Sequence, residues 1–271
     1  MRIPILHLYR DPFQELTMTD ALPVPPEFAN SGLTVRAVGT VPPRRFQVLG
    51  ERSSCTNLLR RLMMRHSPLE ASEVLGWKHG FPHMVAVPGD LAVLGIVRNA
   101  ADWARSMHSK PWHTPPHMQR MTFAEFSRAP GETVVDRARY FGGPEARPLV
   151  GRALQHDRDP ISGAPYANLF ALRSAKIRAL TGMFRRDCTM VLIRMEDMQT
   201  NPEAVISAVC EGLSLPTPAT PFKPFARRLG SKFKPSVEQR PATPATLSAQ
   251  DMDFLRAQTD PEVEAALGYA Y

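Results

Sequence analysis

The chain has few cysteines, no long apolar run and no dense basic block, and each absence excludes a class of protein. Three cysteines in 271 residues, Cys55, Cys188 and Cys210, are too few and too widely spaced for a disulfide framework or a zinc pattern. No run of about eighteen apolar residues exists, so the sequence predicts no membrane span. The first residues turn polar too soon for a secretory signal, and we expect a cytoplasmic protein.

The charge balance is basic, with 33 Lys and Arg residues, 26 Asp and Glu residues and a net charge of +7. The basic residues are spread along the chain in pairs, which argues against a nucleic-acid-binding arm. The excess of positive charge fits a binding site for a polyanionic small molecule. A content of 43% hydrophobic residues is typical of a globular chain with a substantial core.

One stretch, residues 45–66, has the pattern of a strand, a tight loop and a helix. An apolar run is followed by small and hydroxyl-bearing residues, and apolar side chains then recur at helical spacing. Such a loop aims backbone N–H groups and the positive end of a helix dipole at one point, where Ser53, Ser54 and Thr56 add hydroxyl donors. The stretch is expected to bind phosphate or sulfate; an ordinary turn with capping residues explains it equally well.

This loop does not match the ATPase motif, because Cys55-Thr56-Asn57 stands where Gly-Lys-Ser/Thr would be needed. No lysine of that kind is available to reach a terminal phosphate. The sequence therefore gives no reason to expect bound magnesium. The cation in the middle of the loop is Arg52.

Further strands and helices are expected to alternate along the chain. Continuous apolar runs over 91–97 and 189–193 are typical of strands buried on both faces of a parallel sheet. A short strand is expected within 73–82. Amphipathic patterns predict helices over 167–184, near 248–258 and over 261–267. The alternation predicts an α/β fold of three layers, with a mainly parallel central sheet between helices.

We expect a single α/β domain over residues 46–271. Residues 1–45, rich in proline and without a sustained period, are expected to form an N-terminal arm. Residues 110–165, where the pattern weakens around one expected helix near 122–140, are expected to form an insertion at the acceptor site.

Several motifs together resemble the sulfotransferases that use 3′-phosphoadenosine-5′-phosphosulfate (PAPS). The residues from Gly50 to Asn57 resemble the family's loop for the 5′-phosphosulfate. The residues from Val97 to Ser106 resemble its 3′-phosphate motif, in which an arginine ends a strand and a serine follows eight residues later, here Arg98 and Ser106.

Three later segments add to this resemblance. Residues 193–203 are similar to a family strand that ends before a helix, and residues 267–269 are similar to the family's ending. Arg227, Arg228 and Gly230 are a looser match to its late basic loop. The resemblance runs from about residue 46 to the C-terminus, apart from much of 110–165. It implies a sulfotransferase fold related to the P-loop NTPases.

The resemblance also implies a reaction: in-line transfer of a sulfuryl group from PAPS to a hydroxyl or amine of a small molecule or glycan, without a metal. Arg52 and Lys78 would stabilise charge on the leaving oxygen, and His79 would take the acceptor's proton. For His79, a structural role through a bond to a backbone carbonyl is the alternative. The donor would be held by Arg52, Ser53, Ser54, Cys55, Thr56, Asn57, Arg98, Ser106, Arg227, Arg228 and Gly230.

The chain departs from the family pattern at four points, and at one of them Met195 stands where the family often has an aromatic residue beside the adenine. Arg52 replaces the usual lysine and keeps its charge. Cys55 replaces a common glycine. His79 directly follows Lys78, whereas the family's histidine usually stands two residues after the lysine.

Two other functions remain open from the sequence. One is a small-molecule kinase of related fold, which would need magnesium and a Walker-type lysine. The other is a non-catalytic nucleotide- or anion-binding protein. His108, His113 and His117 lie among prolines with no nearby carboxylate or cysteine ligand, so they are expected to line the acceptor pocket and not to hold a metal.

Overall fold

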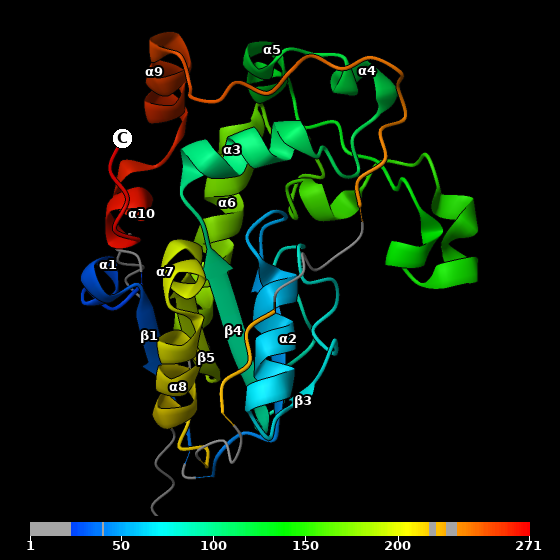
Figure 1. Cartoon of the computed structure of the whole chain (residues 1–271). Coiled ribbons are helices and arrows are strands. Elements are labelled where there is room, and N and C mark those ends of the chain that lie inside the picture. The colour runs from blue at the N-terminus through cyan, green and yellow to red at the C-terminus, as the bar shows by residue number, and fades with distance from the viewer. Residues whose placement is uncertain (1–22, 40, 217–220, 226–231) are drawn as a thin grey trace, which may run out of the picture.

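The fold is built on one five-stranded sheet, seen in a computed structural model that describes residues 23–39, 41–216, 221–225 and 232–271 (Figure 1). The strand order is β1-β5-β4-β2-β3, and all neighbours are parallel except β1 and β5. The predicted α/β class with a mainly parallel sheet is therefore confirmed. The strands are β1 Leu33–Arg36, β2 Arg45–Gly50, β3 Glu70–Ala71, β4 Leu91–Val97 and β5 Thr189–Arg194.

The centre of the sheet follows from the apolar runs of the sequence. Every residue of β4 is buried, as expected of a strand with parallel neighbours on both sides and helices on both faces. One face packs Val48, Leu94 and Ile193 against α2 (Thr56–His66) and α8 (Pro202–Gly212). The other face packs residues such as Val93 against α6 (Leu169–Thr181) and α10 (Pro261–Ala266).

The remaining helices lie at the ends of these layers. A third core cluster, which includes Trp103, Phe170 and Leu255, joins α3, α5, α6 and α9 beyond the carboxyl ends of the strands (Figure 1). The other helices are α1 Phe28–Ser31, α3 Ala100–Ser109, α4 Pro116–Gln119, α5 Phe123–Arg128, α7 Met195–Thr200 and α9 Ala249–Gln258, with 3₁₀ turns η1 Ala138–Tyr140, η2 Gly143–Leu149, η3 Gln155–Asp157 and η4 Gly182–Arg185.

Two expectations about the first half of the chain need correction. The expected N-terminal arm contributes β1 to the sheet, antiparallel to β5. No strand forms within 73–82; the short edge strand β3 precedes it. The backbone at Leu75 and Gly76 bonds instead to the side-chain amide of Gln47, at 2.8 Å in both cases, which replaces strand pairing in this segment.

The segment expected to lie over the acceptor site contains mostly turns. The helix expected near 122–140 is short: α5 follows the capping residue Thr122, begins at Phe123 and ends at Arg128, because Pro130 comes two residues later. The short helix α4 precedes α5, and the rest of the segment folds through two isolated β-bridges and the turns η1, η2 and η3. Residues 232–248 then cross back over α4 and α5 before α9 (Figure 1).

Candidate functional site

The candidate site lies at the carboxyl ends of β2 and β4, where an open parallel sheet offers a crevice for ligands. The loop after β2 leads directly into α2, and the turn after β4 leads into α3. Gly50 is required at the start of the loop, since a β-carbon there would lie 2.6 Å from the carbonyl oxygen of Ile96. The close approach of these two strands brings the first two sequence motifs together.

The loop has the backbone of an anion cradle. Ser53 and Cys55 both adopt the left-handed conformation, with φ of 65° and 63°. Cys55 is the N-cap residue of α2, and its side chain caps no amide group. Its carbonyl accepts bonds from the amides of Leu58 and Leu59, which leaves the amides of Thr56 and Asn57 without a partner among the described residues. Within the described residues, the hydroxyls of Ser53 and Thr56 have no hydrogen-bond partner, whereas Ser54 donates to the carbonyl of Glu51 at 2.5 Å.

Arg98 connects the two predicted donor motifs. It follows the last residue of β4 and donates from its guanidinium to the carbonyl oxygen of Ser53 at 2.8 Å. Its own carbonyl accepts a bond from buried Arg173 at 2.7 Å. Asn99 caps α3 by accepting bonds from the amide groups of Ala101 and Asp102, and Ser106 lies half-buried two turns further along.

Lys78 and His79 lie on the other side of the loop, beside the N-terminus of α2. The main chain of Lys78 accepts a bond from the amide of Gly50 at 2.9 Å, and its ammonium donates to Oδ1 of Asn57 at 2.5 Å. Burial lowers the pKa of Lys78. The structure therefore places the ammonium of Lys78 beside the loop between β2 and α2, as its predicted role requires.

His79 has one ring nitrogen bonded and one free. Its Nδ1 lies 2.7 Å from the carbonyl oxygen of Gly50. Because a carbonyl only accepts, Nδ1 carries the proton, and Nε2 is left as an acceptor without a partner among the described residues. Burial and the neighbouring charge of Lys78 hold the pKa of His79 well below its usual value, so the ring is neutral at pH 7.

Arg52 lies in a buried ion-pair cluster under the loop. Its side chain is 3% exposed, and it donates to Oδ2 of Asp157 at 2.6 Å and to the carbonyl of Trp112 at 3.2 Å. Lys176 donates to the other oxygen of Asp157 and to the carbonyl of His79, the latter at 2.7 Å. Burial alone would raise the pKa of Asp157, but the two cations outweigh it and hold that pKa well below the usual range.

This cluster changes how Arg52 can act. Two of its nitrogens are already bonded, and Nε has no partner among the described residues; the same holds for Oε2 of Glu51. Burial raises the pKa of Glu51 against the attraction of Lys176 and Arg52. A direct contact between Arg52 and the donor stays a prediction, whereas its contact with Asp157 fixes the loop from below.

The three histidines of the insertion have separate surroundings. His108 bonds to Thr243 and to the carbonyl of Met121, and exposed His117 lies 3.2 Å from exposed Glu132. His113 pairs with Asp136. The described part of the chain contains no group of three or more potential metal ligands and no helix long and apolar enough to cross a bilayer.

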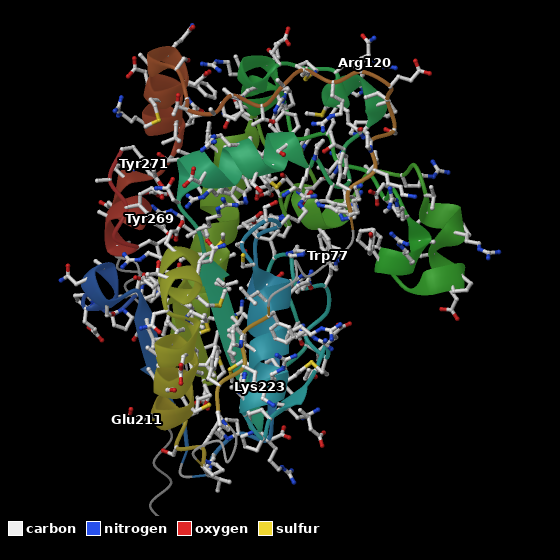
Figure 2. The ribbon with its side chains drawn as sticks, viewed as in Figure 1. Trp77, Arg120, Glu211, Lys223, Tyr269 and Tyr271 are labelled. Atoms are coloured by element: carbon white, nitrogen blue, oxygen red, sulfur yellow. The ribbon has the colours of Figure 1, made fainter. Side chains whose placement is uncertain are left out.

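Several rings pack around Trp77, which is labelled in Figure 2. Its ring centroid lies 5.2 Å from His79, 5.5 Å from His113, 5.4 Å from His156 and 5.2 Å from Phe141. The segment 110–165 therefore does contact the predicted site. The residues predicted as a late basic loop, Arg227, Arg228 and Gly230, lie outside the described residues.

Three important residues were missed by the sequence reading. Lys176 could have been found, because it lies on the core-facing stripe of α6 with Ile177 and Leu180, where an unpaired lysine is rarely tolerated. Asp157 and Asp136 lie in turns without a periodic pattern. Only the folded chain shows that these two carboxylates face Arg52 and His113.

Comparison with known proteins gives no relative for this chain: no protein-family model matches it, and neither the curated proteins nor the solved structures contain a match.

Proposed function

We propose that this protein is a PAPS-dependent sulfotransferase with the P-loop-like fold of that family, acting on a hydroxyl or amine of a small molecule or glycan. The observation that carries the proposal is the bond from Arg98 to the carbonyl of Ser53 at 2.8 Å. It joins the motif that resembles a 3′-phosphate site to the loop that resembles a 5′-phosphosulfate site. This arrangement supports a site for both ends of one bisphosphate nucleotide at the carboxyl ends of β2 and β4.

The donor's 5′ end would lie in the loop from Ser53 to Asn57, where the unbonded amides of Thr56 and Asn57 and the helix dipole favour an anion. Arg98 and Ser106 would bind the 3′-phosphate, as the resemblance implies. The resemblance implies the same role for Arg227, Arg228 and Gly230.

Charge develops on the bridging oxygen as the sulfur–oxygen bond breaks, and a fixed cation there accelerates the step. Lys78 supports this role, because Asn57 at the start of α2 holds its ammonium beside the loop. Arg52 would act with it, and its pairing with Asp157 keeps its charge close to the loop. An imidazole of the site would take the acceptor's proton, and neutral His79 with its free Nε2 is the residue predicted for this from the sequence.

The donor site is tested by calorimetric titration with 3′-phosphoadenosine-5′-phosphate (PAP) in EDTA, compared with ATP and magnesium. We expect PAP to bind without metal. Arg98→Ala should weaken binding about 10-fold to 150-fold, the value of one charge-assisted hydrogen bond of about 1.5–3 kcal/mol. Arg120→Ala is the matched control, because Arg120 is exposed and lies near α4, away from the loop (Figure 2).

Each of the other outcomes contradicts the proposal. Magnesium-dependent binding of ATP without binding of PAP would favour the kinase of related fold. Binding of neither nucleotide would favour a non-catalytic protein. Equal losses in Arg98→Ala and Arg120→Ala would remove Arg98 from the donor site.

A further inference from the structure

Three imidazoles lie against Trp77, and they differ in what each could do with a proton. His79, His113 and His156 have ring centroids 5.2, 5.5 and 5.4 Å from the indole. A neutral imidazole that acts as a general base becomes positively charged as it takes the proton, so the groups around the ring decide whether it can act. The three rings therefore need to be compared by the charges that face them.

His79 is poorly placed to become an imidazolium. Its Nδ1 has only the carbonyl of Gly50 as a partner. Lys78, Arg52 and Lys176 all disfavour a positive charge on this ring, in addition to its burial. His79 can accept a hydrogen bond as a neutral ring, but a proton taken there would lie near three cations.

His113 has the partner that His79 lacks. Its Nδ1 lies 2.8 Å from Oδ1 of Asp136, and its backbone amide lies 3.4 Å from Oδ2 of the same carboxylate. A carboxylate accepts only, so Nδ1 carries the proton and Nε2 is the basic nitrogen. Asp136 thus fixes the tautomer and favours the imidazolium, against the burial of the ring and the charge of Arg52, which together lower the pKa of His113. His156 is exposed and has no carboxylate bonded to its ring among the described residues.

The surrounding structure holds His113 in one position. The residue is 5% exposed and adopts φ of 62°, a conformation that non-glycine residues rarely hold unless the surrounding structure fixes it. The rings of Tyr140 and Phe141 also pack against it, at 5.8 and 5.1 Å. The carbonyl of the preceding residue, Trp112, accepts a bond from Arg52, which ties this turn to the phosphate loop.

We propose that His113, oriented by Asp136, is the general base of the acceptor site. The inference rests on the proposed sulfuryl transfer and moves the base from His79 to the insertion. The acceptor O–H proton passes to Nε2 of His113 while the acceptor oxygen attacks sulfur. The bond from sulfur to the bridging oxygen breaks, and the products are a sulfate ester, PAP and an imidazolium paired with the Asp136 carboxylate.

The first test is turnover, measured as PAP release from PAPS with a fixed panel of phenols, sugars and amines. His113→Gln should lose at least about 100-fold in turnover, the lower end of what a general base contributes, with PAP affinity unchanged by calorimetry. His79→Gln should lose less than His113→Gln. The matched control is His83→Gln, because His83 is exposed and its ring has no partner among the described residues, so turnover should stay unchanged.

Asp136 is a positioning residue, and two substitutions separate this role from a structural one. In Asp136→Asn the amide can donate to Nδ1, which moves the ring proton to Nε2 and removes the base. Asp136→Ala leaves the tautomer free to exchange. We therefore expect Asp136→Asn to be slower than Asp136→Ala, whereas a purely structural role predicts the reverse because asparagine preserves the shape.

Imidazole ¹⁵N spectra test the same arrangement without turnover. In the wild-type protein Nε2 of His113 should be unprotonated at pH 7, and Asp136→Asn should shift the ring toward the Nε2–H tautomer. A protonated Nε2 in the wild type, or full turnover in His113→Gln, would overturn the inference. Absence of PAP binding and PAPS turnover in the wild type would instead overturn the proposed function.

Discussion

The ion-pair cluster under the loop gives the sharpest prediction about stability, through the change Asp157→Asn. Asp157 is fully buried and is shared by Arg52 and Lys176, which are 3% and 4% exposed. Asparagine keeps the volume but leaves two buried cations without their carboxylate. Removal of one partner from a buried pair costs about 3–5 kcal/mol, so we expect the free energy of unfolding to fall by that amount.

The assay is urea denaturation at pH 7, supported by thermal unfolding. At roughly 2–4 °C per kcal/mol for a chain of this size, the melting temperature should fall by about 6–20 °C. Asp159→Asn is the matched control two residues away, because Asp159 closes a local turn with Ser162. It should cost less than about 1 kcal/mol. Equal, small losses in both variants would refute the buried cluster.

The same cluster predicts a pH dependence with a defined sign. The pKa of Asp157 is depressed in the folded protein, so its contribution is complete above the unfolded value of about 4 and is lost as pH falls toward the folded pKa. The difference in unfolding free energy between wild type and Asp157→Asn should therefore be constant from about pH 6 to 7 and shrink below about pH 4. A difference that grows on acidification would contradict the depressed pKa.

Three further predictions concern the loop. Cys55→Gly should raise the free energy of unfolding by about 0.5–1 kcal/mol, because glycine adopts the positive φ without strain, whereas Ser54→Gly, at a position without positive φ, should lower it. The pKa of Lys78 is lowered, so PAP affinity should begin to weaken at a pH below the usual pKa of lysine. Lys78→Arg should abolish that loss, because arginine keeps its charge. The same loss of affinity in Lys78→Arg would exclude Lys78 as its cause. Trp103→Phe should cost about 2–4 kcal/mol in urea denaturation, since its indole N–H donates to the carbonyl of Arg52 at 2.9 Å in a buried site; a loss below 1 kcal/mol would contradict that bond's importance.

The central strands and the main helices could be predicted because their signals are local. The run over 91–97 is β4 itself, and the helices expected near 248–258 and over 261–267 correspond to α9 and α10. A strand that is buried on both faces has apolar side chains on both, so it appears in the sequence as a continuous apolar run. The loop between β2 and α2 was found for the same reason.

The predictions that were wrong concern segments whose structure depends on contacts between residues distant in sequence. β1 has a short, mixed pattern and forms by pairing with β5, which lies more than 150 residues later. The backbone amide of Leu75 donates to the side chain of Gln47, and the pattern of apolar residues in the sequence cannot predict such a bond. Propensity is a weak guide where tertiary contacts decide.

The candidate site was predicted in part. The loop, Lys78 and Arg98 could be found because their residue types occur at recognisable spacings. The structure brings them together at the carboxyl ends of β2 and β4. The contacts of Asp157 and of the His113–Asp136 pair depend on how residues 110–165 fold beside this site. A carboxylate in a turn has no sequence signal that distinguishes a buried partner from a solvated surface group.

The central claim, sulfuryl transfer from PAPS, is tested most directly by incubating the purified chain with PAPS in EDTA and measuring both PAP and the sulfated product of each acceptor in the panel. We predict that PAP and one class of sulfated acceptor appear in equal amounts without any metal, and that Arg98→Ala reduces both. Absence of a sulfated product and of PAP, together with magnesium-dependent turnover of ATP, would contradict the claim.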